Sequence, residues 1–170
     1  QIQEDNIYLI KGNLFNEDPK LAKRAEQVAL LTQDVTEVLS SLGELKATVS
    51  PQLKIVYHSA CSLQHGQKVH EQPKTLLKQV GLSVFEPAEG HLCCGSAGTY
   101  NIREPDLADK MLKRKVNSIE RLDPDVVVTG NIGCMTQIAT GTRIPVVHTV
   151  EMLDWATGGP VPPALVHHSF

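Results

Sequence analysis

The sequence is poor in aromatic residues, has no excess of basic residues and contains no long apolar run. Phe, Trp and Tyr make up 4% of the 170 residues, so Val, Leu, Ile and Ala must fill most of the interior. A net charge of −3 gives no electrostatic basis for binding nucleic acid. No run approaches the roughly 20 apolar residues that span a bilayer. With 41% hydrophobic residues, the chain is expected to be globular.

The first residues also lack the features of a signal peptide. The segment Gln1–Asp5 is polar and acidic, with no apolar stretch behind a basic start. We therefore expect a reducing cytoplasm, where cysteines are metal ligands or reactive thiols more often than disulfides. The sequence has no initiator Met, which predicts a fragment or a processed form.

Short apolar segments alternate with amphipathic ones through most of the chain. This alternation predicts an α/β fold with a mainly parallel four-stranded sheet and helices on both of its faces. The strands are predicted at 54–58, 82–86, 125–129 and 145–148, with the third apolar on both faces like an inner parallel strand. Helices are predicted at 73–80, from Pro105 to Ile119, in a short segment at Cys134, and at 150–156, where Thr149 can act as the cap.

A long helix is predicted before the first strand. Asp18 and Pro19 are typical of a helix start, and apolar residues then recur every three or four positions until Gly43 ends the pattern. We therefore divide the chain into an N-terminal helical segment, 1–50, packed on the domain, a cysteine-rich domain, 51–158, and a flexible tail, 159–170, that contains three prolines.

The chain has four cysteines, and each follows a predicted strand. Cys61 follows the first strand, Cys93 and Cys94 the second, and Cys134 the third. Because ligand sites collect at the carboxyl edge of parallel sheets, these remote cysteines are expected to meet there. His148 ends the fourth strand at the same edge.

A cluster of thiolates suits an iron-sulfur cluster or zinc. Adjacent residues in an extended segment point apart, so Cys93 and Cys94 are awkward ligands for one small ion. A cluster offers separate iron atoms to each, and Gly95 and Gly98 let the backbone approach closely. The pattern favours a cluster over zinc and leaves zinc open.

The cysteine motifs resemble the cysteine-rich CCG domain, which occurs in heterodisulfide reductases and in iron-sulfur subunits of flavin-linked hydroxyacid dehydrogenases. Over about residues 18–157 the chain is similar to the C-terminal part of glycolate oxidase (glycolate dehydrogenase) iron-sulfur subunits. The resemblance is carried by four segments: YHSACSLQHGQ at 57–67, CCGSAGTYN at 93–101, TGNIGC at 129–134 and VEMLDW at 150–155.

The resemblance implies a [4Fe-4S] cluster held by Cys61, Cys93, Cys94 and Cys134. It further implies electron transfer, within a complex that oxidises glycolate to glyoxylate, from subunits that carry FAD toward the respiratory chain. No residue of this chain is expected to be catalytic. Without a transmembrane segment, the expected location is the cytoplasm, with peripheral attachment at the inner membrane through the complex.

Two features depart from the family pattern. The general CCG motif ends Cys-x-x-Cys, whereas Gln137 stands at the final position here, as in the glycolate oxidase branch. The ferredoxin-like cysteine runs that begin such subunits do not occur in the sequence. We therefore expect the C-terminal portion of such a subunit, or a shortened relative.

Other interpretations of the same residues stay open. The cysteines could bind zinc, or nothing, in a structural or subunit-docking domain, and the complex could act on lactate or another 2-hydroxy acid. Cys134 could be a nucleophile with His58 or His148 as base, and either histidine could be a ligand, as could Gln137. The basic run Lys110, Lys113, Arg114 and Lys115 is expected to be a solvated helix face or a docking surface.

Overall fold

A computed structural model describes residues 18–49 and 52–168 and contains one parallel sheet. Its strands lie in the order β2-β1-β3-β4, and each neighbouring pair is parallel. The predicted fold class is therefore confirmed. The bounds are β1 Lys54–His58, β2 Ser83–Phe85, β3 Val126–Thr129 and β4 Val146–His148.

The connection between β2 and β3 reverses the direction in which the sheet grows. From β1 the chain adds β2 on one side, then crosses to the other side of β1 to add β3 and β4. The carboxyl ends of β1 and β3 therefore flank the point where the strand order reverses. In open parallel sheets, a crevice for ligands lies at this switch point.

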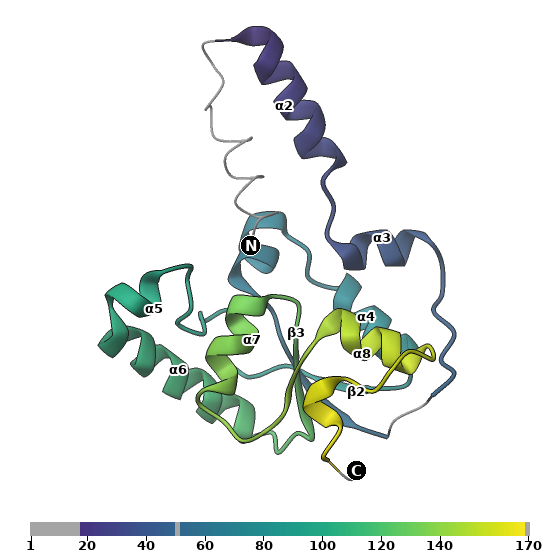
Figure 1. Ribbon diagram of the computed structural model, residues 1–170, viewed down its shortest axis with the longest axis vertical. Helices are drawn as coiled ribbons and strands as arrows, with labels where there is room; N and C mark the ends of the chain where they lie inside the picture. The colour runs from purple at the N-terminus through teal and green to yellow at the C-terminus, as the bar shows by residue number, and fades with distance from the viewer. Residues whose placement is uncertain (1–17, 50–51, 169–170) are drawn as a thin grey trace.

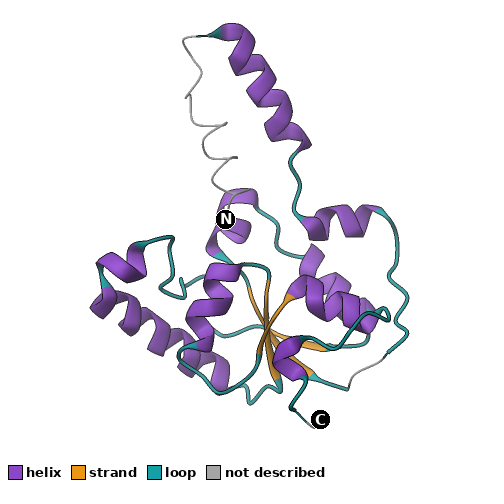
Figure 2. Cartoon of the chain, viewed as in Figure 1, coloured by secondary structure: helices purple, strands orange, loops and turns teal. Residues whose placement is uncertain are grey.

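Helices lie on both sides of the sheet (Figure 2), and a hydrophobic cluster covers each of its faces. One lies under helices α4 and α8, and the other under α6 and α7. All four residues of β3 are buried, as expected for an inner strand. The elements that surround the sheet are η1 Ser62–Gln67 (a π-helical turn), α4 Gln72–Gln79, α5 Tyr100–Arg103, α6 Pro105–Glu120, α7 Ile132–Ala139, α8 Thr149–Ala156 and η2 Pro163–Leu165.

The prediction of a single long helix before the sheet is wrong in one respect, because the structure has two helices there. These are α2, Pro19–Leu31, and α3, Val35–Ser41. Asp34 starts α3 with a capping box: its carboxylate accepts from the backbone N–H of Thr36, and the Glu37 carboxylate accepts from the N–H of Asp34. The apolar spacing continues across the break, which is why the pattern alone predicts one helix.

Helix α2 projects away from the rest of the molecule (Figure 1). None of its 13 residues is buried, and Leu30 and Leu31 are 76% and 82% exposed. Helix α3, in contrast, places Leu39 against the core beside α4. Of the two helices described in the N-terminal segment, the second is thus the one packed on the sheet domain, and residues 1–17 of that segment lie outside the described residues.

The C-terminal segment is attached to the core through Leu165, which is 2% exposed and lies in the cluster under α4 and α8. Leu165 belongs to η2, in the stretch after residue 159 for which the sequence predicts a flexible tail. Among the described residues, no helix is long and apolar enough to cross a membrane.

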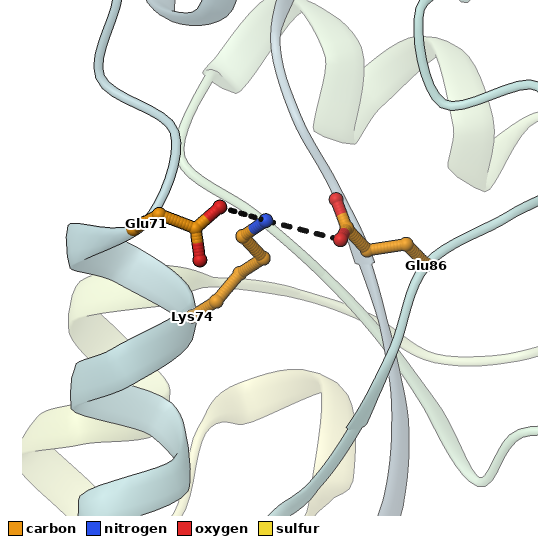
Figure 3. A network of polar contacts seen from close by, with 3 residues as sticks. All are labelled: Glu71, Lys74 and Glu86. Carbon is orange, nitrogen blue, oxygen red and sulfur yellow. Dashed lines mark hydrogen bonds and ion pairs between the residues drawn. The ribbon is translucent and has the colours of Figure 1, made fainter.

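An ion-pair network joins α4 to the segment after β2 (Figure 3). The Lys74 ammonium lies 2.7 Å from the Glu71 carboxylate and 3.0 Å from that of Glu86. Because Glu71 and Glu86 are largely exposed, each pair is expected to contribute little. The network lies at the start of the segment that leads from β2 to Cys93 and Cys94.

The buried core and the projecting helix α2 predict contrasting effects of mutation on stability. Leu77 in α4 is completely buried, so Leu77→Ala should lower the free energy of unfolding by about 2–5 kcal/mol. Leu30→Ala in the projecting α2 should change it by no more than about 0.5 kcal/mol. Urea unfolding followed by circular dichroism measures both, and similar losses in the two variants would contradict this packing.

Candidate metal centre

The structure brings all four cysteines together at the carboxyl edge of the sheet. Cys61 precedes the η1 turn after β1, Cys93 and Cys94 lie in the loop after β2, and Cys134 lies in the first turn of α7 after β3. Thiol contacts link Cys61 to Cys93, Cys93 to Cys94 and Cys94 to Cys134. All four thiols are free. The predicted meeting of the sulfurs is confirmed by this arrangement.

Burial divides the site into an inner and an outer half. Cys94 and Cys134 are 0% and 5% exposed, whereas Cys61 and Cys93 are partly exposed. The inner half also contains His58, the last residue of β1, which is completely buried. One ring nitrogen of His58 and the Sγ atoms of Cys94 and Cys134 lie within 4.8 Å of one another. These three side chains could hold a metal ion.

Hydrogen bonds between the thiols raise the pKa of two of them and lower the pKa of the other two. The hydrogen bond of Cys61 to Cys93 raises the pKa of Cys61 and lowers that of Cys93. The hydrogen bond of Cys94 to Cys134 likewise raises the pKa of Cys94 and lowers that of Cys134. Alternate sulfurs therefore favour the thiol and thiolate forms. Positive charge that enters the site, such as that of a metal, would favour the thiolate form of all four.

The backbone around Cys134 is held by Asn131. The Asn131 side-chain oxygen accepts from the backbone N–H of Cys134 at 3.0 Å and caps α7. Cys134 thus lies at a helix N-terminus, as the sequence predicts, where the helix dipole also favours a thiolate.

The Cys-Cys-Gly loop requires glycine at position 95. Gly95 has a φ of +97°, and an added Cβ atom would lie 2.5 Å from the backbone oxygen of Ala108 in α6. The close approach predicted for Gly95 is thus made to a helix of the same domain. The Gly95 N–H also donates to the Cys93 Sγ at 3.3 Å. Helix α6 and the loop that carries two of the thiols therefore pack backbone to backbone.

Lys115 is a functional candidate that the sequence interpretation missed. The solvated face predicted for its basic run is wrong at this residue, which is 2% exposed. Its ammonium donates to the Glu89 carbonyl oxygen at 2.7 Å, in the cysteine loop. Burial lowers the pKa of Lys115, and the nearby sulfurs of Cys94 and Cys61 act in the opposite direction. Lys115 therefore places its amino group near the thiols, where its protonated form would offset negative charge on the sulfurs.

The rest of the basic run lies at the surface. Lys113 pairs with Asp109 at 2.6 Å, with both side chains largely exposed. Arg114 pairs with Glu89.

The other residues considered from the sequence have structural partners. Gln137 accepts a hydrogen bond from the Asn101 amide at 2.9 Å, which ties α7 to α5. His148 caps α8, with its Nδ1 accepting from the N–H of Val150 at 3.3 Å. The capping role predicted for Thr149 is thus wrong by one residue. His65 and His91 are both exposed, His65 in η1 after Cys61 and His91 two residues before Cys93.

Comparison with protein families agrees with this geometry. The model of the CCG cysteine-rich domain matches residues 55–139, a segment that begins in β1 and ends with α7. The chain belongs to the CCG family. The matched segment contains all four cysteines, Lys115 and His58.

Curated relatives of this CCG chain include proteins named for glycolate oxidase and for lactate utilization. The chain is 36% identical over 145 residues to the glycolate oxidase iron-sulfur subunit of Escherichia coli, an alignment covering 85% of this chain and 36% of that protein. It is 30% identical over 148 residues to lactate utilization protein A of Shouchella clausii (83% of this chain, 62% of that protein). The Bacillus subtilis protein of that name is 28% identical over 149 residues (84% and 63%). The resemblance to glycolate oxidase iron-sulfur subunits is confirmed.

The packing of Gly95 against α6 predicts a specific sensitivity to side-chain addition. Gly95→Ala should lower the free energy of unfolding by about 2 kcal/mol or more, because it adds both a strained φ and a backbone clash. Gly90→Ala in the same loop places its Cβ at an ordinary 3.5 Å from the nearest atom and should change stability by less than about 1 kcal/mol. Urea unfolding tests the difference, and equal effects would contradict the close packing.

Proposed function

We propose that this CCG domain is an iron-sulfur electron-transfer unit of a glycolate-oxidising flavoenzyme complex. The observation that carries the proposal is the convergence of four free thiols at the switch point of the sheet. The relative with 36% identity is named as an iron-sulfur subunit of glycolate oxidase. The chain spans about a third of the length of that relative and about three fifths of the lactate relatives, so the proposed unit is one part of a larger system.

The residues present fit a [4Fe-4S] cluster. Cys61, Cys93, Cys94 and Cys134 would hold it, since thiolate sulfur is the usual ligand of cluster iron. The separation of their pKa values supports a site in which cationic metal would replace shared protons. When bound, the cluster would accept and donate one electron at a time. The chain's own contribution is to bind the cluster, exclude water on the inner side and place the Lys115 cation nearby.

The substrate chemistry would lie on other subunits. In this proposal, FAD on a partner subunit oxidises glycolate to glyoxylate, and the electrons pass through this domain toward the respiratory chain. The complex would lie in the cytoplasm, peripherally attached at the inner membrane. Within the chain, residues 51–158 form the unit that carries the proposed function.

A second candidate is the same electron-transfer role in a complex that oxidises lactate. The observation that favours it is the similarity to lactate utilization protein A in two organisms. Copurification of the flavin subunits, followed by assays with glycolate, lactate and other 2-hydroxy acids, separates the two candidates.

The cluster proposal predicts the metal content of the purified chain. Anaerobic reconstitution with iron and sulfide should give bound iron and acid-labile sulfide in equal amounts, together with an electron paramagnetic resonance signal after reduction. Cys94→Ser, at the buried centre of the site, should lose most of the iron, whereas His65→Ala at the rim should keep it. Stoichiometric zinc without iron or sulfide would contradict the redox function and favour a zinc-binding structural domain.

The buried cation predicts a change in reduction potential. Lys115→Met removes a positive charge beside the sulfurs, so the more negative, reduced cluster is destabilised and the potential falls by tens of millivolts, on the order expected for one nearby charge. Lys113→Met removes an exposed charge on the same helix and should leave the potential nearly unchanged. Redox titration monitored by electron paramagnetic resonance measures both, and equal shifts would show that Lys115 has no special role.

A further inference from the structure

We propose that His58 is a fifth protein ligand of the metal centre, with a ring nitrogen on metal in the inner half of the site, beside Cys94 and Cys134. This inference rests on the proposed metal-binding function. It adds to the four cysteines a donor of a different kind, neutral imidazole nitrogen.

The position of His58 follows from the register of the sheet. His58 is the last residue of β1 and pairs with Thr129, the last residue of β3. Side chains alternate between the faces of a strand, so His58 points to the same side as Val56, which lies in the cluster that includes Cys94 and Cys134. The sheet therefore places the imidazole at the switch point, on the face that carries the two buried thiols.

Both nitrogens of the buried imidazole lack a well-formed hydrogen bond to the residues that the structure describes. Within the described part of the chain, both Nδ1 and Nε2 of His58 are buried and make no hydrogen bond of good geometry. A buried polar group without a hydrogen-bond partner destabilises the folded protein. Native proteins satisfy nearly all such groups, and an ion is one of the partners that can do so. His148 at the same edge differs, since its Nδ1 is engaged in capping α8.

The distances suit coordination. The ligand atoms of His58, Cys94 and Cys134 all lie within 4.8 Å of one another. Ordinary metal–sulfur and metal–nitrogen bonds at tetrahedral angles would hold such atoms roughly 3.5–3.8 Å apart. Small side-chain rotations therefore bring the three donors to coordination distance. The alternative arrangement, in which His58 only donates a hydrogen bond to the Cys134 sulfur, leaves its other nitrogen buried without a partner.

A nitrogen ligand would also supply the fifth donor that the general CCG motif takes from its last cysteine. The final position of the general CCG motif is Gln137, and its amide oxygen accepts from Asn101. With His58, the site has four sulfurs and one nitrogen. Compared with a site of five thiolates, a site in which neutral imidazole takes the place of one is less negative. Its reduction potential is therefore higher, as in clusters that have histidine in place of two cysteines.

The first experiment detects the nitrogen directly. The full chain is labelled with ¹⁵N-histidine, reconstituted anaerobically with iron and sulfide, reduced, and examined by pulsed electron paramagnetic resonance. We expect a hyperfine coupling of a directly bound nitrogen in the wild type and in His91→Ala, an exposed histidine of the cysteine loop. The coupling should disappear in His58→Phe, which fills the volume without a donor, and in His58→Cys. A wild-type cluster without such a coupling overturns the proposal, whether or not the variants fold.

The second experiment separates failure of this inference from failure of the cluster proposal. If iron and sulfide do not bind, the metal-free chain is titrated with Co²⁺ alone, monitored by its absorption. His58→Phe should weaken Co²⁺ binding by at least about 100-fold, since even the loss of outer partners of metal ligands costs 10–100-fold. His58→Cys, which restores a soft donor, should bind within about 10-fold of the wild type, and His91→Ala should be unchanged. Equal affinity in His58→Phe and the wild type overturns the ligand role.

Discussion

The parallel pairing of β1 with both β2 and β3 is the constraint on which the site depends. Cys61 and Cys93 lie far apart along the chain, as do Cys94 and Cys134, so local sequence cannot bring these sulfurs together. Pairing on both sides of β1 aligns the carboxyl ends of three strands, and the following loops must then converge. The same pairing places the His58 side chain between them. Backbone hydrogen bonds thus determine where the chemistry lies, and the cysteines need no disulfide to stay close.

The site brings together four thiols whose thiolate forms would repel one another without a nearby cation. Buried thiols that approach one another retain some of their protons, which appears as raised pKa values for Cys61 and Cys94. A bound metal would displace these protons, so loading depends on pH and releases acid. Lys115 supplies charge of the required sign, but its ammonium is hydrogen-bonded to a backbone carbonyl and does not enter the thiol chain. Lys115 can therefore offset part of the negative charge of the thiolates, and a bound metal would offset the remainder.

The sequence predicts the framework of this molecule well because its main signals are local and strong. Four apolar runs identify the strands, and the position of each cysteine after a strand locates the site. The N-terminal pattern predicts one continuous helix because apolar spacing survives the break, while the capping box at Asp34 and Glu37 is a weaker signal. The basic neighbours of Lys115 conceal its role, although its spacing from Leu112 and Ile119 places it on the inward face of α6. That His58 has no well-formed hydrogen bond to any described residue depends on packing and has no sequence signal.

The unequal burial of the four sulfurs gives the centre one side that is accessible to solvent and one side that is not. Cys94 and Cys134 lie against the core, whereas Cys61 and Cys93 are partly exposed to the outside. A small species that reaches the sulfurs from solution meets Cys61 and Cys93 first. Iron, sulfide, dioxygen and an electron donor would therefore reach the centre from the side of Cys61 and Cys93. The partial exposure that shortens the path of an electron therefore also exposes a cluster to the oxidant that destroys it. A subunit that covers Cys61 and Cys93 would change both properties at once.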